Sequence, residues 1–185
     1  MASFRVVYDT CVLVPAPVRD LLLRVAEAGL VRASMSDDIL DELERVLTRD
    51  FEVPSDGAAR LRRAVERTFD DNVIPRERYE DLVGLGGLPD ADDEHVLAAA
   101  RSVGAQVIVT MNLKDFPFDR VARFEIEILH PDDFLLDLVD LFPVKIVRII
   151  EDQAATLKNP PRTYEEVLDA LARTVPGTVA RLREL

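Results

Sequence analysis

The alternation of short apolar runs with helical patterns is the feature that most constrains the fold of this chain. Residues 4–7 form a β-favouring run that leads to Asp9, and residues 106–110 repeat that form shortly before Asn112. Runs of this length and composition are typical of buried parallel strands. Because helical patterns separate them, we predict an α/β fold with a central parallel sheet flanked by helices.

The same periodicity predicts the boundaries of the other elements in this part of the chain. Further strands are expected at 30–33 and 125–129. The expected helices lie at 17–28, 36–49, 57–70 and 92–103. In open parallel sheets ligands gather beyond the carboxyl ends of the strands, and this is where Asp9 and Asn112 would lie.

The last quarter of the chain shows helical patterns only. One helix is expected at 143–157, and a second begins at Thr163 after a proline-rich break at 159–161. Thr163 and Glu166 have the spacing of a capping box, which favours a helix start. The Pro176-Gly177 pair is expected to end this second helix.

The length and hydrophobic content of the chain indicate one main domain. With 185 residues, 48% of them hydrophobic, the chain can bury a full core. We predict an α/β domain at 1–138 and a helical extension at 139–185, which packs on that domain or on a second subunit. No apolar run approaches the roughly 20 residues that span a bilayer, and no leader pattern opens the sequence, so we expect a cytoplasmic protein with no membrane partner.

Cysteine usage and charge narrow the possible classes of site and partner. The single Cys11 cannot form an internal disulfide, and two histidines are too few for a cysteine and histidine zinc site, so any metal site should be built mostly from oxygen ligands. The net charge of -12 opposes the approach of RNA and argues against a simple basic nucleic-acid-binding module. Residues 1–140 carry a net charge of -13 and residues 141–185 a net charge of +1, so the excess of acidic side chains lies in the α/β part.

Acidic residues gather after a glycine-rich loop, at the predicted start of the helix at 92–103. The four acids are Asp90, Asp92, Asp93 and Glu94. The loop at 83–89 is flexible by composition and lacks the third glycine of a dinucleotide fingerprint. Asp93 projects from the apolar face of the helix, so its charge needs a partner such as helix N–H groups, an arginine or a cation. Capping by one acid, with the others solvated, is the ordinary alternative.

Two further carboxylates occupy positions that favour a role in a site. Asp9 follows a buried strand although aspartate is a poor strand former, and its ordinary alternative is a turn formed with Thr10. Glu42 lies beside the apolar arc of the helix at 36–49. At that position it borders a cleft or is simply solvated at the edge of the helix.

Oxygen donors also follow the second predicted strand, where ordinary loop chemistry is the alternative explanation. Together with the acids above, they come from separate elements and could converge on one cleft: Asp9, Glu42, Asp93, Asn112 and Asp115. Crowded carboxylates repel one another, and hard divalent cations relieve that repulsion while taking oxygen ligands. The sequence therefore predicts a magnesium or manganese site.

Four blocks of sequence carry a resemblance to a known family. They read YDTCVL at 8–13, DEL within 36–47, DADDEHVLAAA at 90–100 and VTMNLKDFP at 109–117. In this order they resemble the PIN-domain family, particularly the VapC-type toxins of bacterial toxin–antitoxin pairs. The blocks fall within about 4–134, and the tail around residues 160–163 is similar to a longer subgroup. The resemblance implies a PIN-like three-layer sandwich with a C-terminal helical extension.

The resemblance also implies an activity and roles for the candidate residues. It implies a metal-dependent endoribonuclease, the toxin of a type II pair, with Mg²⁺ or Mn²⁺ as cofactor. Asp9 and Asp93 would be the main metal ligands, directly or through water. Glu42 and Asp115 would complete the acidic set, and Asn112 would assist. Many family members have an aspartate at the position of Asn112, which leaves the number of metal ions open, and the identity of the general base is open as well.

The implied partners are an RNA substrate and a cognate antitoxin, and we expect two copies to pair and build the substrate groove. A basic rim or an ordinary solvated surface could be formed by Arg19, Arg24, Arg45, Arg49, Lys114 and Arg120. Phosphatase chemistry at Asp9 or Cys11 is excluded, because a second aspartate and an arginine are missing at the required spacings. A non-catalytic PIN-like module that binds RNA or protein is the alternative function.

Overall fold

One five-stranded sheet forms the centre of the computed structural model, which describes residues 4–185. The strands are β1 (Arg5–Tyr8), β2 (Arg32–Ser36), β3 (Val73–Ile74), β4 (Val107–Val109) and β5 (Glu127–Leu129). Their order is β3-β2-β1-β4-β5, and all pairings are parallel. Tyr8 pairs with Val109, so the two runs that were predicted as buried parallel strands are neighbours at the middle of the sheet.

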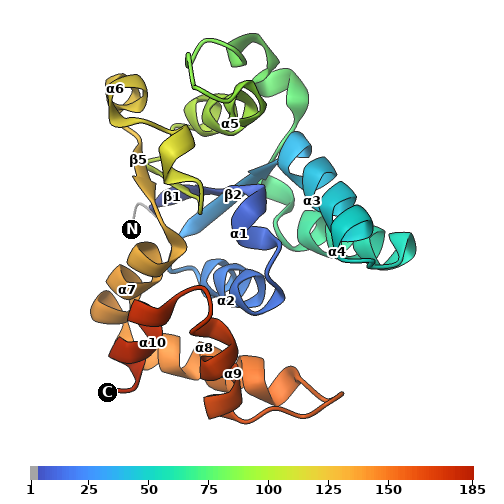
Figure 1. The fold of residues 1–185 in the computed structure, drawn as a ribbon, viewed down its shortest axis with the longest axis vertical. Helices are drawn as coiled ribbons and strands as arrows, with labels where there is room; N and C mark the ends of the chain where they lie inside the picture. The colour runs from blue at the N-terminus through green and yellow to red at the C-terminus, as the bar shows by residue number, and fades with distance from the viewer. Residues whose placement is uncertain (1–3) are drawn as a thin grey trace.

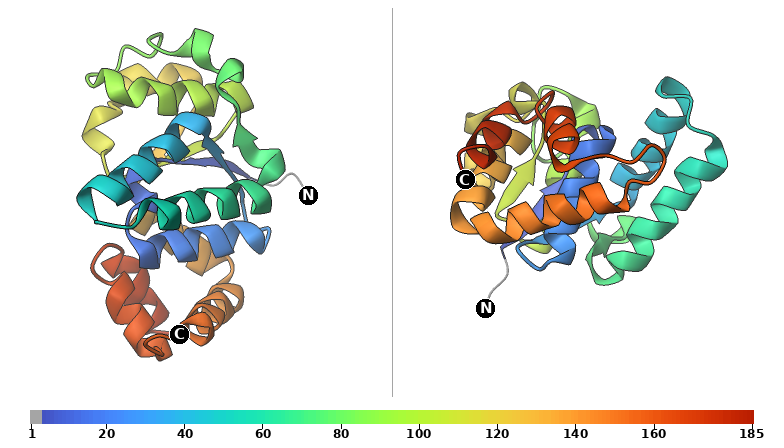
Figure 2. Two further views of the ribbon diagram at one scale, coloured as in Figure 1. Left: turned by 90° about the vertical axis from the view of Figure 1, so that its right-hand side faces the viewer. Right: turned by 90° about the horizontal axis from the view of Figure 1, so that it is seen from below.

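Helices cover both faces of this sheet and form the three-layer sandwich that was predicted. They are α1 (Thr10–Leu13), α2 (Ala16–Glu27), α3 (Asp37–Asp50), α4 (Ser55–Thr68), α5 (Glu94–Val103), α6 (Phe118–Val121), α7 (Pro131–Leu141), α8 (Pro143–Thr156), α9 (Tyr164–Leu171) and α10 (Pro176–Leu182). Figure 1 shows α5 on one face and α2 on the other, with α7 to α10 beyond α2. The left view of Figure 2 shows these layers stacked in the same order.

Local sequence signals account for several of the helix ends. The Ser36 hydroxyl accepts a hydrogen bond from the Ile39 amide and starts α3. Thr163 and Glu166 form the predicted capping box at the start of α9. Helix α5 ends at Gly104, whose φ of 62° lies in the left-handed region that glycine adopts without strain.

The C-terminal helices pack on the α/β domain through α2. The side-chain amide of Gln153 on α8 donates to the Pro17 carbonyl at 3.0 Å, and Arg24 on α2 donates to the Thr156 hydroxyl at 2.8 Å. Helix α7 runs across the predicted division at 138/139. No helix formed by residues 4–185 is long and apolar enough to cross a membrane.

The prediction for Pro176-Gly177 was wrong, because this pair begins a helix. Helix α9 ends at Leu171, and α10 starts with Pro176. Proline is favoured at the first helical position because its missing N–H would have no partner there. The Asp132 carboxylate then accepts hydrogen bonds from the amides of Gly177 and Thr178, so a residue about 45 positions away completes this helix start.

Candidate active site

Asp9 lies where β1 and β4 end together, and it is held from three directions. Its amide donates to the Val109 carbonyl at 3.1 Å, and the side chain is buried with 4% exposure. The Thr110 hydroxyl and the Cys11 thiol both donate to its Oδ2, at 2.6 and 3.0 Å. Asp9 makes no side-chain capping bond to α1, which argues against the simple turn-forming interpretation. Because both bonds use Oδ2, Oδ1 is left for another ligand.

Thr110 and Cys11 are supporting residues that the sequence analysis did not identify. The Cys11 sulfur accepts from the Met111 amide at 3.1 Å, and the Thr110 hydroxyl accepts from the Asn112 amide at 3.0 Å. Burial, and then the nearby charge of Asp9, raise the pKa of the Cys11 thiol to about 12. Cys11 therefore remains a thiol that donates to Asp9, consistent with its exclusion as a nucleophile.

Glu42 faces the same region from α3 and is tied to α1. The Thr10 hydroxyl donates to Glu42 Oε2 at 2.8 Å, and His95 Nε2 lies 3.9 Å from the same oxygen. Arg45 lies 3.7 Å from Oε1. Since Thr10 directly follows Asp9, the backbone of α1 couples the positions of the two carboxylates. Glu42 therefore borders a cleft and is not merely a solvated edge residue.

Asp93 is an acid of the candidate set whose charge has no compensating partner among the described residues. It stands at the N-cap of α5 but makes no capping hydrogen bond, and within residues 4–185 it forms no ion pair. The pKa of Asp93 is raised to about 7, first by partial burial and then by the charges of neighbouring carboxylates. Those neighbours, from the largest effect to the smallest, are Asp9, Asp115, Asp90 and Glu42. The structure thus brings these acids into one electrostatic cluster.

The other acids near the start of α5 have separate roles. Asp90 Oδ1 accepts from the Asp92 amide at 2.9 Å and caps the short 3-10 turn Ala91–Asp93, while Asp92 is exposed. Glu94 is buried with 4% exposure, and its two oxygens accept from the amides of Gly86 and Leu88 at 2.9 and 2.7 Å. Glu94 therefore holds the glycine-rich loop, and only Asp93 remains unexplained by local structure.

Asn112 and Asp115 follow β4 and differ in how closely they approach the cluster. Asp115 lies in the 3-10 turn Leu113–Asp115, is partly buried, and is near enough to raise the pKa of Asp93. Asn112 is exposed, and only its backbone is tied to the site, through the Thr110 hydroxyl. The cluster therefore joins four of the five predicted residues, with Asn112 at its margin.

The carboxylate oxygens of this cluster are ligands of the kind that hard cations prefer. The acids are not gathered closely around a single metal position. Among residues 4–185, no three His, Cys, Asp or Glu side chains are grouped so that they could hold a metal ion. Magnesium keeps several waters and commonly uses only one or two protein carboxylates, so a closed cage is not required. The carboxylate-rich set and the uncompensated Asp93 fit an ion of this kind.

Of the clustered acids, Glu42 lines a polar cleft of about 360 Å³, whereas Asp9, Asp93 and Asp115 do not. The lining of this cleft includes acidic residues, basic residues and one histidine: Glu42, Asp92, Arg45, Arg76 and His95. His95 is a further candidate residue, because its Nδ1 is buried without a hydrogen-bond partner within the described residues. In the sequence, His95 was marked only by its place in the block at 90–100.

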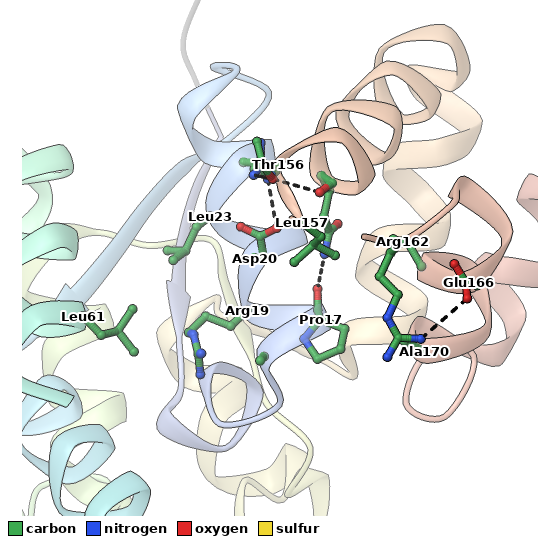
Figure 3. A pocket seen from close by; sticks show the side chains of 14 residues that line it. Pro17, Arg19, Asp20, Leu23, Leu61, Thr156, Leu157, Arg162, Glu166 and Ala170 are labelled. Carbon is green, nitrogen blue, oxygen red and sulfur yellow. Dashed lines mark hydrogen bonds and ion pairs between the residues drawn. The ribbon is translucent and has the colours of Figure 1, made fainter. Parts of the chain in front are cut away.

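A separate cavity of about 450 Å³ lies between α2, α8 and α9 (Figure 3). Arg19 and Arg24 line it, and none of the predicted acids does. Arg24 pairs with Asp20 at 3.0 Å, while Arg49 on α3 pairs with Asp50 at 2.7 Å. The six cations that were considered as one basic rim are therefore divided among different surfaces, and only Lys114 and Arg120 flank Asp115 in the chain.

A parallel sheet with helices on both faces and acids at its carboxyl edge is the arrangement expected of a PIN-like protein. Residues 5–114 match the family model described as PIN domain, and residues 131–184 match the one described as VapC50 C-terminal domain. The chain therefore belongs to the PIN-domain family and is of the VapC type with a C-terminal extension. Asp115 lies one residue beyond the match to the PIN domain.

One curated relative supports this assignment. "Putative ribonuclease VapC50" from Mycobacterium tuberculosis (strain ATCC 25618 / H37Rv) is 46% identical to the chain over 93 residues. The matched region is 50% of this chain and 55% of the relative, so the chain spans about half the length of the curated relative that it matches.

Proposed function

We propose that this protein is a metal-dependent endoribonuclease and the toxin component of a type II toxin–antitoxin pair. The observation that carries the proposal is the state of Asp93, which is neither capped nor ion-paired and lies within the electrostatic reach of Asp9, Asp115 and Glu42. Such a carboxylate needs a proton or a cation. Membership of the PIN-domain family and the similarity to a protein described as a putative ribonuclease support the choice of RNA hydrolysis.

The acids would share the binding of one or more divalent ions. Asp9 and Asp93 would be the main ligands of Mg²⁺ or Mn²⁺, directly or through water, and Glu42 and Asp115 would complete the set. When bound, the ion lowers the pKa of a water and offsets charge on the phosphate and the leaving oxygen. Asn112, at the margin of the cluster, would assist through its side-chain amide.

The chain's own residues would orient these groups and move the proton. Thr110 and Cys11 fix Oδ2 of Asp9, and Thr10 fixes Oε2 of Glu42, so neither carboxylate has to be ordered when substrate arrives. One carboxylate of the set would accept the proton of the attacking water. Helices α1, α3 and α5 supply the rigid elements on which this arrangement depends.

The partners follow from the same proposal. The substrate would be RNA, and a cognate antitoxin would cover the acidic site with a basic segment, for which the charge of -12 provides complementarity. Two copies of the chain would pair to build the substrate groove. We also propose the division into a PIN domain at 1–138 and a helical extension at 139–185, in a protein that works in the cytoplasm.

Cleavage of RNA by a matched set of variants tests the proposed function. Wild type, Asp93→Asn and Asp81→Asn would be incubated with single-stranded RNA, with Mg²⁺ or with chelator. Asp81 is an exposed acid outside the candidate site, so its replacement removes the same charge and controls for a general effect of charge. We expect cleavage by wild type and Asp81→Asn only with metal, and a loss on the order of 100-fold for Asp93→Asn.

The same experiment separates the alternative of a non-catalytic PIN-like module. Such a module would bind RNA or a protein without metal-dependent cleavage, and Asp93→Asn would behave like wild type. Equal cleavage by wild type and Asp93→Asn would show that a contaminant or a different site performs the reaction.

A further inference from the structure

Large apolar side chains are exposed on the two segments that flank the acidic cluster. Leu85 is 56% exposed in the loop that leads to α5. Leu113 and Phe118 are 43% and 82% exposed, on either side of Asp115. We call these three residues, Leu85, Leu113 and Phe118, the apolar rim. A group of exposed apolar side chains beside polar residues is typical of an interaction site.

Two arginine side chains link the segment that follows β4 to the loop before α5. Arg123, which follows α6, donates to the carbonyl oxygens of Leu85 and Gly86 at 2.9 and 3.0 Å. A Cβ atom built on Gly87 would lie 3.7 Å from Nη1 of Arg120, so this side chain also reaches the loop. Figure 1 shows α6 beside the loop that precedes α5.

The loop is held rigidly even though its composition predicts flexibility. The Glu94 carboxylate accepts hydrogen bonds from the amides of Gly86 and Leu88. Arg123 donates to the carbonyl oxygens of Leu85 and Gly86. The guanidinium of Arg123 also lies over the Phe124 ring, 4.6 Å from its centroid. Since Leu85 is fixed before any ligand arrives, binding at the rim has little loop ordering to oppose it.

Positive charge accompanies the rim in an otherwise acidic protein. Lys114 is exposed and forms no ion pair with any residue from 4 to 185, and Arg120 pairs only with its neighbour Asp119, at 3.4 Å. Both lie in the segment that carries Leu113 and Phe118. An aromatic side chain between basic residues is the combination with which proteins bind unpaired nucleotides.

We propose that the apolar rim is the surface on which unpaired bases of single-stranded RNA stack, with Phe118 as the principal platform. This inference rests on the proposed function, which places a phosphodiester at Asp93 and Asp115. Because only two residues separate Asp115 from Phe118, the nucleotide next to that phosphodiester is within reach of Phe118. Lys114 and Arg120 contact the backbone of the strand and carry no base preference.

Binding of a labelled RNA tests the platform without depending on cleavage. The parent protein is full-length Asp93→Asn, and the probe is a fluorescent single-stranded RNA of about 12 nucleotides. Adding Phe118→Ala should weaken binding by about tenfold, because a base loses its stacking partner, whereas Phe118→Tyr should retain it. Phe51→Ala, which removes a 58% exposed phenylalanine at the end of α3, should leave the affinity unchanged. Lys114→Gln should reduce the slope of the logarithm of RNA affinity against the logarithm of salt concentration by about one.

Two results would overturn the platform: no RNA binding by the parent protein, or equal affinity after Phe118→Ala. The second result could be accompanied by a loss of self-association in sedimentation. That combination would identify the rim as a contact between copies of the chain. Failure of the nuclease proposal gives a different pattern, in which wild type binds RNA through Phe118 but never cleaves it.

Discussion

Asp93 carries a charge that the folded, metal-free protein does not compensate. Its pKa of about 7 lies above the value of about 3.9 expected in the unfolded chain, so the folded state holds the proton more tightly. The stabilisation of the folded state by this protonated carboxyl group is fully present below about pH 4 and is lost as the pH rises toward 7. In the absence of metal, the ionised site should therefore destabilise the fold at neutral pH.

Asp93→Asn should consequently be more stable than wild type above pH 7 in chelator. The gain should be on the order of 1 kcal/mol, discounted for solvent screening because Asp93 is partly exposed, and it should shrink toward pH 5. Urea unfolding of both proteins at pH 5 and pH 8 measures it. The same gain at both pH values would contradict the assignment, and Asp81→Asn provides the charge-matched control.

Thr110 is predicted to act through Asp9. Thr110→Val keeps the shape of a fully buried side chain but removes the 2.6 Å hydrogen bond to Oδ2. Because the orientation of a ligating carboxylate then loosens, the Mg²⁺ concentration for half-maximal cleavage should rise by about tenfold or more. Thr48→Val, whose hydroxyl bonds only to the Glu44 carbonyl in its own helix, should leave that concentration unchanged.

The sequence indicated the acids but not the residues that position them. Asp9 was identifiable because an aspartate after a buried strand is unusual. Thr110 lies 101 positions away and meets Asp9 only through the pairing of β1 with β4, which a single sequence does not align residue by residue. Glu94 was indistinguishable from its acidic neighbours, because its burial depends on the path of the preceding loop.

At the scale of elements, the loop before α5 requires glycine at one position. A Cβ on Gly86 would lie 2.6 Å from Glu94 Oε2 and 2.6 Å from Leu97 Cδ2. Gly86→Ala should therefore displace the loop and lower the free energy of unfolding by roughly 1–3 kcal/mol. Gly57→Ala in α4 meets only ordinary contacts and should be neutral or stabilising. Chemical denaturation compares the two, and equal effects would show that the loop is not closely held.

The elements that were predicted well have strong local patterns, and the others depend on tertiary context. The amphipathic pattern of α3 placed that helix within one residue at each end. Strand β3 was not predicted, because its two residues are too few to show a periodic pattern. It forms through its pairing with β2. Pro176-Gly177 fits both a helix end and a helix start, and the choice is made by Asp132 on α7.

At the scale of the molecule, the extension is part of the same folded unit as the sheet. Its buried side chains, such as Ile146 and Ile150, belong to the same core cluster as those of α2. Gln153 adds a hydrogen bond across that contact. The whole chain should therefore unfold in one cooperative transition, with equal calorimetric and van't Hoff enthalpies. Two separated transitions in calorimetry would show that the extension folds independently.

The central claim is that carboxylates from distant parts of the sequence together bind divalent metal. Calorimetric titration with Mn²⁺ of wild type, Asp93→Asn and Asp81→Asn measures this directly. We predict saturable binding to wild type and Asp81→Asn, and at least a tenfold weaker affinity for Asp93→Asn. Binding that is absent from wild type, or unchanged in Asp93→Asn, would contradict the claim.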